Sequence, residues 1–144
     1  YDIGNVIANM IFAWANGDAA GAEDFCKWVE SVLVDVVNMT KEKMEKYYDE
    51  HVTDTMCKNA LYKKYYMDTI IEDTSAVTGL ELIRRIVGMA NVKDITTIAD
   101  EAKRARAEKI CITAAIDFIK NRNDKKCGKC FLRTLKDAIA EIDA

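Results

Sequence analysis

The residues best suited to chemistry are the cysteines, and Cys127 and Cys130 form a Cys-x-x-Cys pattern. We expect this pattern to open the last helix, where the helix N-terminus stabilises a thiolate and lowers the thiol pKa. A redox site of the thioredoxin type would need a βαβ setting, which this chain does not offer. A zinc site would need to recruit Cys111 together with Cys57 or His51. We therefore favour structural disulfides over a metal or redox site.

Five cysteines in 144 residues also favour an oxidising compartment, because disulfides are rare in reducing cytosol. The sequence does not fix their pairing and leaves one thiol over, which is either buried or bonded to a partner chain. Cys26 and Cys57 would face each other only if the chain turned near Thr40, whereas the loop 120–126 allows Cys111 to reach the Cys-x-x-Cys pair. The disulfide candidates are Cys26, Cys57, Cys111, Cys127 and Cys130.

Cysteine usage and one glycosylation sequon point to a secreted, extracellular protein. The sequon places Asn38 before Met39 and Thr40, so Asn38 is the glycosylation candidate. The chain begins at Tyr1, which is compatible with a removed leader. No apolar run reaches the ~18 residues of a membrane helix, so we expect no membrane span.

Two carboxylates lie within apolar stretches, Asp35 in VLVDVV and Asp117 in AAIDFI. Such surroundings can perturb a carboxyl pKa, although a polar helix edge or a hydrogen bond to a buried ring is the simpler interpretation. The chain has one histidine, His51, and no nucleophile motif. We therefore expect no enzyme activity, no catalytic residue, no metal and no cofactor.

Positive charge is concentrated between Ala102 and Lys136, which contain 11 Lys or Arg and 3 Asp or Glu in a chain of net charge −3. Such a region can attract an extracellular protein or an anionic polysaccharide. Nucleic acid is disfavoured, because the chain is acidic overall and the segment lacks interleaved aromatic residues. The alternative is an ordinary solvated face. The basic surface candidates are Lys103, Arg104, Arg106, Lys109, Lys120, Arg122, Lys125, Lys126, Lys129 and Arg133.

Hydrophobic periodicity predicts an all-α fold, a single-domain bundle of five to six helices over residues 1–144, stapled by disulfides. A break at 73–75, followed by a capping box from Thr78 to Glu81, separates the third and fourth helices. Asp94 is expected to cap the next helix, whose segment from Ile110 to Ile119 is apolar on nearly all sides and therefore buried. The expected helices cover 2–15, 22–51, 55–72, 79–91, 95–120 and 128–143, with 22–51 as one rod.

Long helices combined with five cysteines resemble the small, disulfide-bridged salivary proteins of blood-feeding insects. The resemblance implies a secreted, non-enzymatic protein that binds a host factor through its helical surface. The charge distribution, and not the resemblance, makes the basic region 102–136 the candidate contact. It transfers no ligand-binding residues. The odd cysteine would allow a disulfide-linked oligomer. The alternative function is a carrier of a hydrophobic ligand such as a lipid inside the bundle, lined by methionine and aromatic side chains that are otherwise ordinary core.

Overall fold

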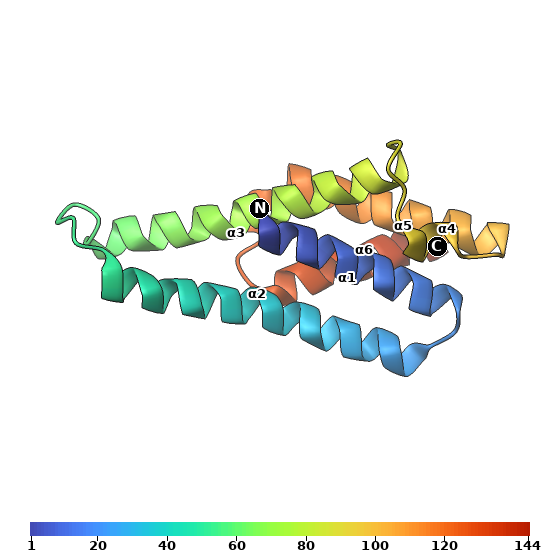
Figure 1. Ribbon diagram of the computed structural model, residues 1–144, viewed down its shortest axis with the longest axis horizontal. Coiled ribbons are helices and arrows are strands. Elements are labelled where there is room, and N and C mark those ends of the chain that lie inside the picture. The colour runs from blue at the N-terminus through green and yellow to red at the C-terminus, as the bar shows by residue number, and fades with distance from the viewer.

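The structure, a computed structural model that describes residues 1–144, is all-α and contains no strand, as predicted. Six α-helices form one bundle (Figure 1). A single cluster of 24 buried hydrophobic residues forms the core. The helices are α1 (Asp2–Ala19), α2 (Glu23–His51), α3 (Ala60–Ile86), α4 (Lys93–Thr96), α5 (Glu101–Lys120) and α6 (Gly128–Asp143), with a 3₁₀ turn η1 (Arg122–Asp124) before α6.

The core lies where α1, α3 and α5 meet, with α2 and α6 closing the bundle. Helix α1 packs against both α2 and α3, α5 lies along α3, and α6 contacts α5 and α2. Helix α5 supplies the buried face expected of it, although Ile116 is 45% exposed, so its surface is not apolar all round. The largest side chains with no exposure are Phe12, Phe118, Phe131, Ile7, Ile11, Leu33, Leu82, Ile110 and Leu135.

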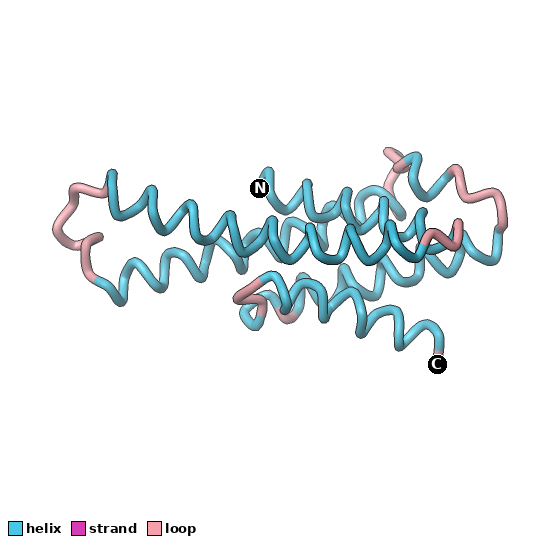
Figure 2. Tube along the Cα trace, turned by 90° about the horizontal axis from the view of Figure 1, so that it is seen from below, coloured by secondary structure: helices cyan, strands magenta, loops and turns pink.

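Helix α2 is one continuous rod, as expected from the absence of glycine and proline within it. It forms a long hairpin with α3, and the hairpin extends well beyond the N-terminus of α1 (Figure 1). Figure 2 shows the connecting loop 52–59 at one extreme end of the molecule. Few side chains are buried near this loop: Tyr48 is the one buried residue of α2 beyond Val37, and the buried residues of α3 begin at Met67. The hairpin tip therefore depends little on the core.

The predicted break at 73–75 is wrong, because α3 runs through it without interruption. Thr74 donates its hydroxyl hydrogen bond to the carbonyl oxygen of Ile70 at 2.8 Å, and Ser75 donates to that of Phe118 at 2.8 Å. Hydroxyl residues favour turns because they compete for backbone groups. Here they are satisfied within α3 and by α5, so the helix continues.

The capping box at Thr78 is wrong for the same reason. The Thr78 hydroxyl lies within hydrogen-bonding distance of two carbonyl oxygens, those of Thr74 at 2.9 Å and Gly4 at 3.3 Å. Glu81 is only 7% exposed and pairs with Arg84 at 2.7 Å and with Arg85 at 3.2 Å. Thr78, which was expected to start a helix, thus lies within α3 and forms a polar link to α1.

The helix predicted over 95–120 is divided into α4 and α5. Asp100 is the N-cap of α5, and its carboxylate accepts hydrogen bonds from the backbone N–H groups of Ala102 at 2.9 Å and Lys103 at 3.1 Å. Asp94, the expected cap, lies in the first turn of α4. At the other end of the fold, α1 continues past its expected stop, and Gly21, with φ of 75°, provides the turn into α2.

The structure contains no disulfide, so the predicted stapling is wrong: all five cysteines are free. Cys26 lies near the start of the uninterrupted α2, whereas Cys57 lies beyond its end, and the turn that would join them is absent. Cys111 has no exposed surface, and burial raises its pKa to about 12. None of the helices is both long enough and apolar enough to cross a membrane.

Candidate functional site

The Cys-x-x-Cys pattern lies at the start of α6, as predicted. Cys127 is the N-cap residue, with extended backbone angles (φ −157°, ψ 166°), and its carbonyl oxygen accepts the backbone N–H of Cys130 at 2.9 Å. The two sulfur atoms are 3.0 Å apart, and both residues are half-buried. The helix start therefore directs both thiols to the same place.

The environment of Cys130 favours its thiolate. Burial of the thiol opposes ionisation, but a hydrogen bond from Cys127, hydrogen bonds from the backbone and the positive charge of Arg133 outweigh it. The pKa of Cys130 is therefore lowered from its usual value. The Nη2 atom of Arg133 lies 3.9 Å from the sulfur.

The connection that precedes α6 is fixed by the carboxylate of Asp117. This group accepts hydrogen bonds from Lys125 at 2.5 Å, Thr134 at 2.6 Å and Asn121 at 2.6 Å. Burial alone would raise the pKa of Asp117, but these three donors lower it below its usual value. The predicted carboxylate Asp117 thus ties η1 and α6 to α5. The other predicted carboxylate, Asp35, is exposed.

Asn38, predicted as a glycosylation site, caps α6. Its side-chain oxygen accepts the backbone N–H of Gly128 at 2.9 Å, although Asn38 itself lies in the middle of α2. Gly128 lies so close to α2 that an added Cβ would come within 2.3 Å of the carbonyl oxygen of Val34. No sequence rule identifies this cap, because the two residues are 90 positions apart. Whether Asn38 carries a glycan stays a prediction.

Most of the predicted basic surface is engaged within the bundle. Arg106 pairs with Asp18 of α1 and, at 2.7 Å, with Asp143 of α6. Lys125 is 8% exposed. Lys103 and Arg104 donate to the backbone carbonyl oxygens of Ala19 and Ile98. Arg122 pairs with Asp73, Lys126 pairs with Glu72, and Arg133 contacts the sulfur of Cys130. Lys109, Lys120 and Lys129 are exposed. Arg106, Arg122 and Lys126 therefore connect one helical segment to another, so not every predicted cation is free to bind a partner.

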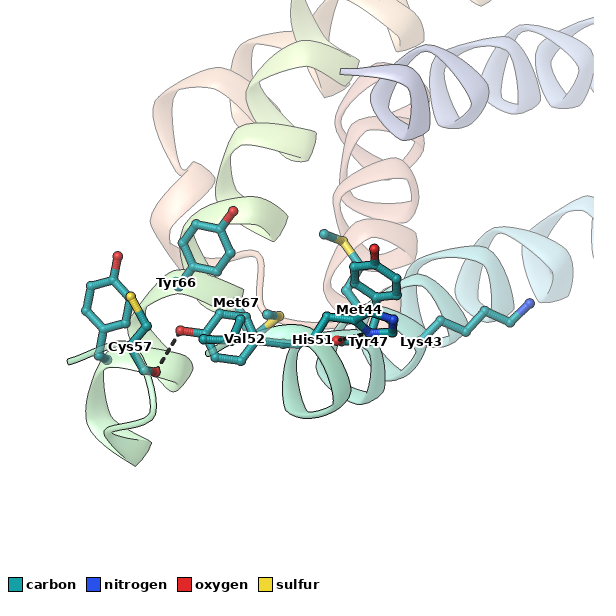
Figure 3. A pocket seen from close by; sticks show the side chains of 10 residues that line it. Lys43, Met44, Tyr47, His51, Val52, Cys57, Tyr66 and Met67 are labelled. Carbon is teal, nitrogen blue, oxygen red and sulfur yellow. Dashed lines mark hydrogen bonds between the residues drawn. The ribbon is translucent and has the colours of Figure 1, made fainter. Parts of the chain in front are cut away.

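An apolar pocket of about 750 Å³ lies in the α2–α3 hairpin, outside the bundle core. Figure 3 shows Tyr66 and Met67 of α3 and Met44 of α2 among its walls. His51 closes one side, with its ring stacked on that of Tyr47 at a centroid distance of 3.9 Å. His51 therefore belongs to the α2–α3 hairpin, whereas Cys111 lies in α5 and the Cys-x-x-Cys pair lies at the start of α6. No group of three His, Cys, Asp or Glu residues is arranged to hold a metal ion.

No protein-family model matches the chain. Individual proteins do, and those that it is similar to are small-molecule kinases. They are methylthioribose kinases from plants and bacteria. The chain is 29% identical over 141 residues to methylthioribose kinase 1 of Oryza sativa subsp. japonica, covering 85% of the chain and 32% of that protein.

Two bacterial relatives give a similar result. The Escherichia coli methylthioribose kinase is 24% identical over 141 residues, covering 88% of the chain and 34% of the relative. The Bacillus pumilus methylthioribose kinase is 27% identical over 141 residues, covering 98% of the chain and 35% of the relative. The chain thus spans about a third of the length of the curated relatives it matches.

These similarities overturn the functional expectations drawn from the sequence. The resemblance to salivary proteins is wrong, and with it the non-enzymatic binder, the expectation of no enzyme activity and the alternative of a hydrophobic carrier, because the relatives are enzymes. The resemblance depended on helical architecture and cysteine count alone. Both features occur in unrelated proteins, and the cysteines form no bridges here.

Proposed function

We propose that this chain is the helical part of a methylthioribose kinase, an enzyme that transfers a phosphoryl group to methylthioribose. One observation carries the proposal: the similarity to the Bacillus pumilus kinase extends over 98% of the chain. A match of this extent includes all six helices rather than one shared motif. Because the chain spans about a third of its relatives, phosphoryl transfer is proposed for the complete enzyme.

The geometry supports a positioning role for this part of the enzyme. Phosphoryl transfer depends mainly on the accurate placement of phosphates, metal ions and the attacking hydroxyl, so the groups involved need a rigid support. Here all six helices contribute to one core, and buried polar links such as Ser75 to Phe118 fix α3 against α5. The bundle thus offers a rigid platform for the remainder of the active site.

The test is a phosphorylation assay on the purified full-length protein. Methylthioribose and a nucleoside triphosphate with Mg²⁺ are supplied, and the sugar phosphate is detected by mass spectrometry. Ribose in place of methylthioribose and a reaction without nucleotide are the controls. We expect a nucleotide-dependent methylthioribose phosphate. A folded protein that gives none, in an assay where the Bacillus pumilus kinase is active, would overturn the proposal.

The extracellular location and the anionic partner stay predictions. The main premise of the location was a bridged cysteine framework, and the structure has five free thiols instead. The partner was inferred from the basic region 102–136. Peptide mapping of Asn38 checks for a glycan, and retention on a heparin column at increasing salt checks the basic region.

A further inference from the structure

We propose that Cys127 and Cys130 form a reversible dithiol–disulfide site that exchanges with small disulfides such as oxidised glutathione. The inference goes beyond the proposed kinase activity and does not depend on it. It is based on the placement of the two sulfur atoms, their access to solvent and the fixed backbone around them.

The two thiols are already arranged for bond formation. Their sulfur atoms are 3.0 Å apart, and a disulfide bond measures about 2.05 Å, so a movement of roughly 1 Å closes the gap. The backbone between them is held in place, because Cys127 O accepts the N–H of Cys130 and Gly128 N–H is capped by Asn38. Closing the bond therefore requires side-chain rotation and no rearrangement of α6.

Cys130 is reachable by a small molecule. Cys130 lines a polar cleft of about 220 Å³ between η1 and α6, and Arg133 and Asp137 also line this cleft. Cys26 and Cys111, by contrast, are buried in the core. Cys57 is half-buried at the hairpin tip, and no hydrogen bond joins its thiol to a second cysteine. The pair at α6 is thus the one place where an incoming disulfide meets two adjacent thiols.

The chemistry is two successive thiol–disulfide exchanges. The Cys130 thiolate, favoured by its lowered pKa, attacks one sulfur of oxidised glutathione and releases one glutathione thiolate, leaving a mixed disulfide on Cys130. Cys127 then attacks the Cys130 sulfur and releases the second glutathione. The two thiol protons pass to the two glutathione thiolates. The protein loses two electrons and two protons, and one oxidised glutathione becomes two reduced ones.

A zinc site is the competing use of a Cys-x-x-Cys pattern. Zinc in structural sites takes four ligands, and catalytic sites use three from the protein. Neither His51 nor Cys111 joins the pair, and no group of three ligand residues is arranged around a common point. The geometry therefore favours exchange over metal binding.

The test is peptide mapping of the full-length protein after equilibration in glutathione buffers of increasing oxidised fraction. Trypsin cleaves after Lys126, Lys129 and Arg133 and so separates the two cysteines onto peptides 127–129 and 130–133. We expect these two peptides to become disulfide-linked, and to separate again when excess reduced glutathione is added. A pair that stays reduced under buffers that glutathionylate Cys57 would overturn the proposal.

Three variants assign the roles of the thiols. In Cys127→Ser the mixed disulfide on peptide 130–133 should accumulate, because the second exchange is lost. In Cys130→Ser glutathione incorporation at the site should be lost, since the attacking thiolate is absent. Cys57→Ser is the matched control, because it removes a half-buried thiol remote from α6 and should leave the linked peptides unchanged. Equal glutathione incorporation in Cys127→Ser and Cys130→Ser would contradict the assignment.

Discussion

Replacing Gly79 by alanine tests whether the crossing of α3 and α5 depends on direct backbone contact. Gly79 lies in the interior of α3, and an added Cβ would come within 2.6 Å of the Ala115 carbonyl oxygen and 2.7 Å of Ile119 Cγ1. Alanine gains about 0.5–1 kcal/mol over glycine inside a helix. Overpacking costs about 1–3 kcal/mol, and the upper end applies where backbone atoms must move. The cost of overpacking is therefore larger than the gain, and we expect Gly79→Ala to lower the free energy of unfolding by about 2–2.5 kcal/mol.

Gly17→Ala is the matched control, because the same change meets a flexible neighbour. An added Cβ at Gly17 would lie 2.6 Å from Cδ1 of Phe25. Phe25 is 41% exposed, so its ring can rotate into solvent at little cost. The higher helix propensity of alanine then determines whether the free energy of unfolding rises or falls. We expect Gly17→Ala to leave the free energy of unfolding unchanged or to raise it by up to about 1 kcal/mol.

Urea unfolding followed by far-ultraviolet circular dichroism measures both variants. The midpoint should fall for Gly79→Ala and hold or rise for Gly17→Ala, with the dependence on urea concentration unchanged. If Gly79→Ala were as stable as the original protein, the backbones of α3 and α5 would have room to separate. If both variants lost equal stability, the distinction between a rigid and a flexible neighbour would be refuted.

Three further outcomes follow from the buried groups. Phe118→Ala should lower the free energy of unfolding by about 3–5 kcal/mol in urea titrations, because it empties a fully buried site beside Phe131, whose ring centroid is 5.3 Å away. Because the pKa of Asp117 is lowered in the folded state, its contribution is present above the unfolded pKa of about 3.9 and is lost as pH falls through the folded value. The stability difference between the original protein and Asp117→Asn, measured by urea titration at pH 7 and pH 3, should therefore narrow at the lower pH. Cys111, with no exposed surface and a pKa of about 12, should react with iodoacetamide at pH 8 only after unfolding, whereas Cys57 reacts in the folded protein; mass spectrometry of the labelled peptides distinguishes the two.

The sequence predicts the helices well where one side is apolar and the other polar. The rod α2 and the buried face of α5 both follow from spacing alone. The sequence-based prediction of helix ends fails at residues 73–81, because threonine and serine in this segment are typical of a helix boundary. Their hydroxyls are instead satisfied by carbonyl oxygens, that of Phe118 being 43 residues away from Ser75. Local patterns carry no information about such distant acceptors.

The candidate site is predictable only in part. The position of the Cys-x-x-Cys pattern at a helix start follows from the sequence, but the state of the thiols does not, because it depends on distances between sulfur atoms. The cap that Asn38 provides to Gly128 also depends on the packing of α2 against α6. Function was mispredicted because helical architecture and cysteine count do not distinguish a kinase from an unrelated helical protein, and the relatives described are only 24–29% identical to the chain.

Because the α2–α3 hairpin extends beyond the core, its outer part should unfold locally more easily than the rest of the bundle. Residues beyond Val37 in α2 and before Met67 in α3 bury almost nothing, so their backbone hydrogen bonds have little side-chain packing to protect them. Such a segment opens and closes by itself, and its amide hydrogens exchange with solvent while those of α5 remain protected. Substitutions in the loop 52–59 thus alter the fraying of the tip and leave the free energy of global unfolding nearly unchanged.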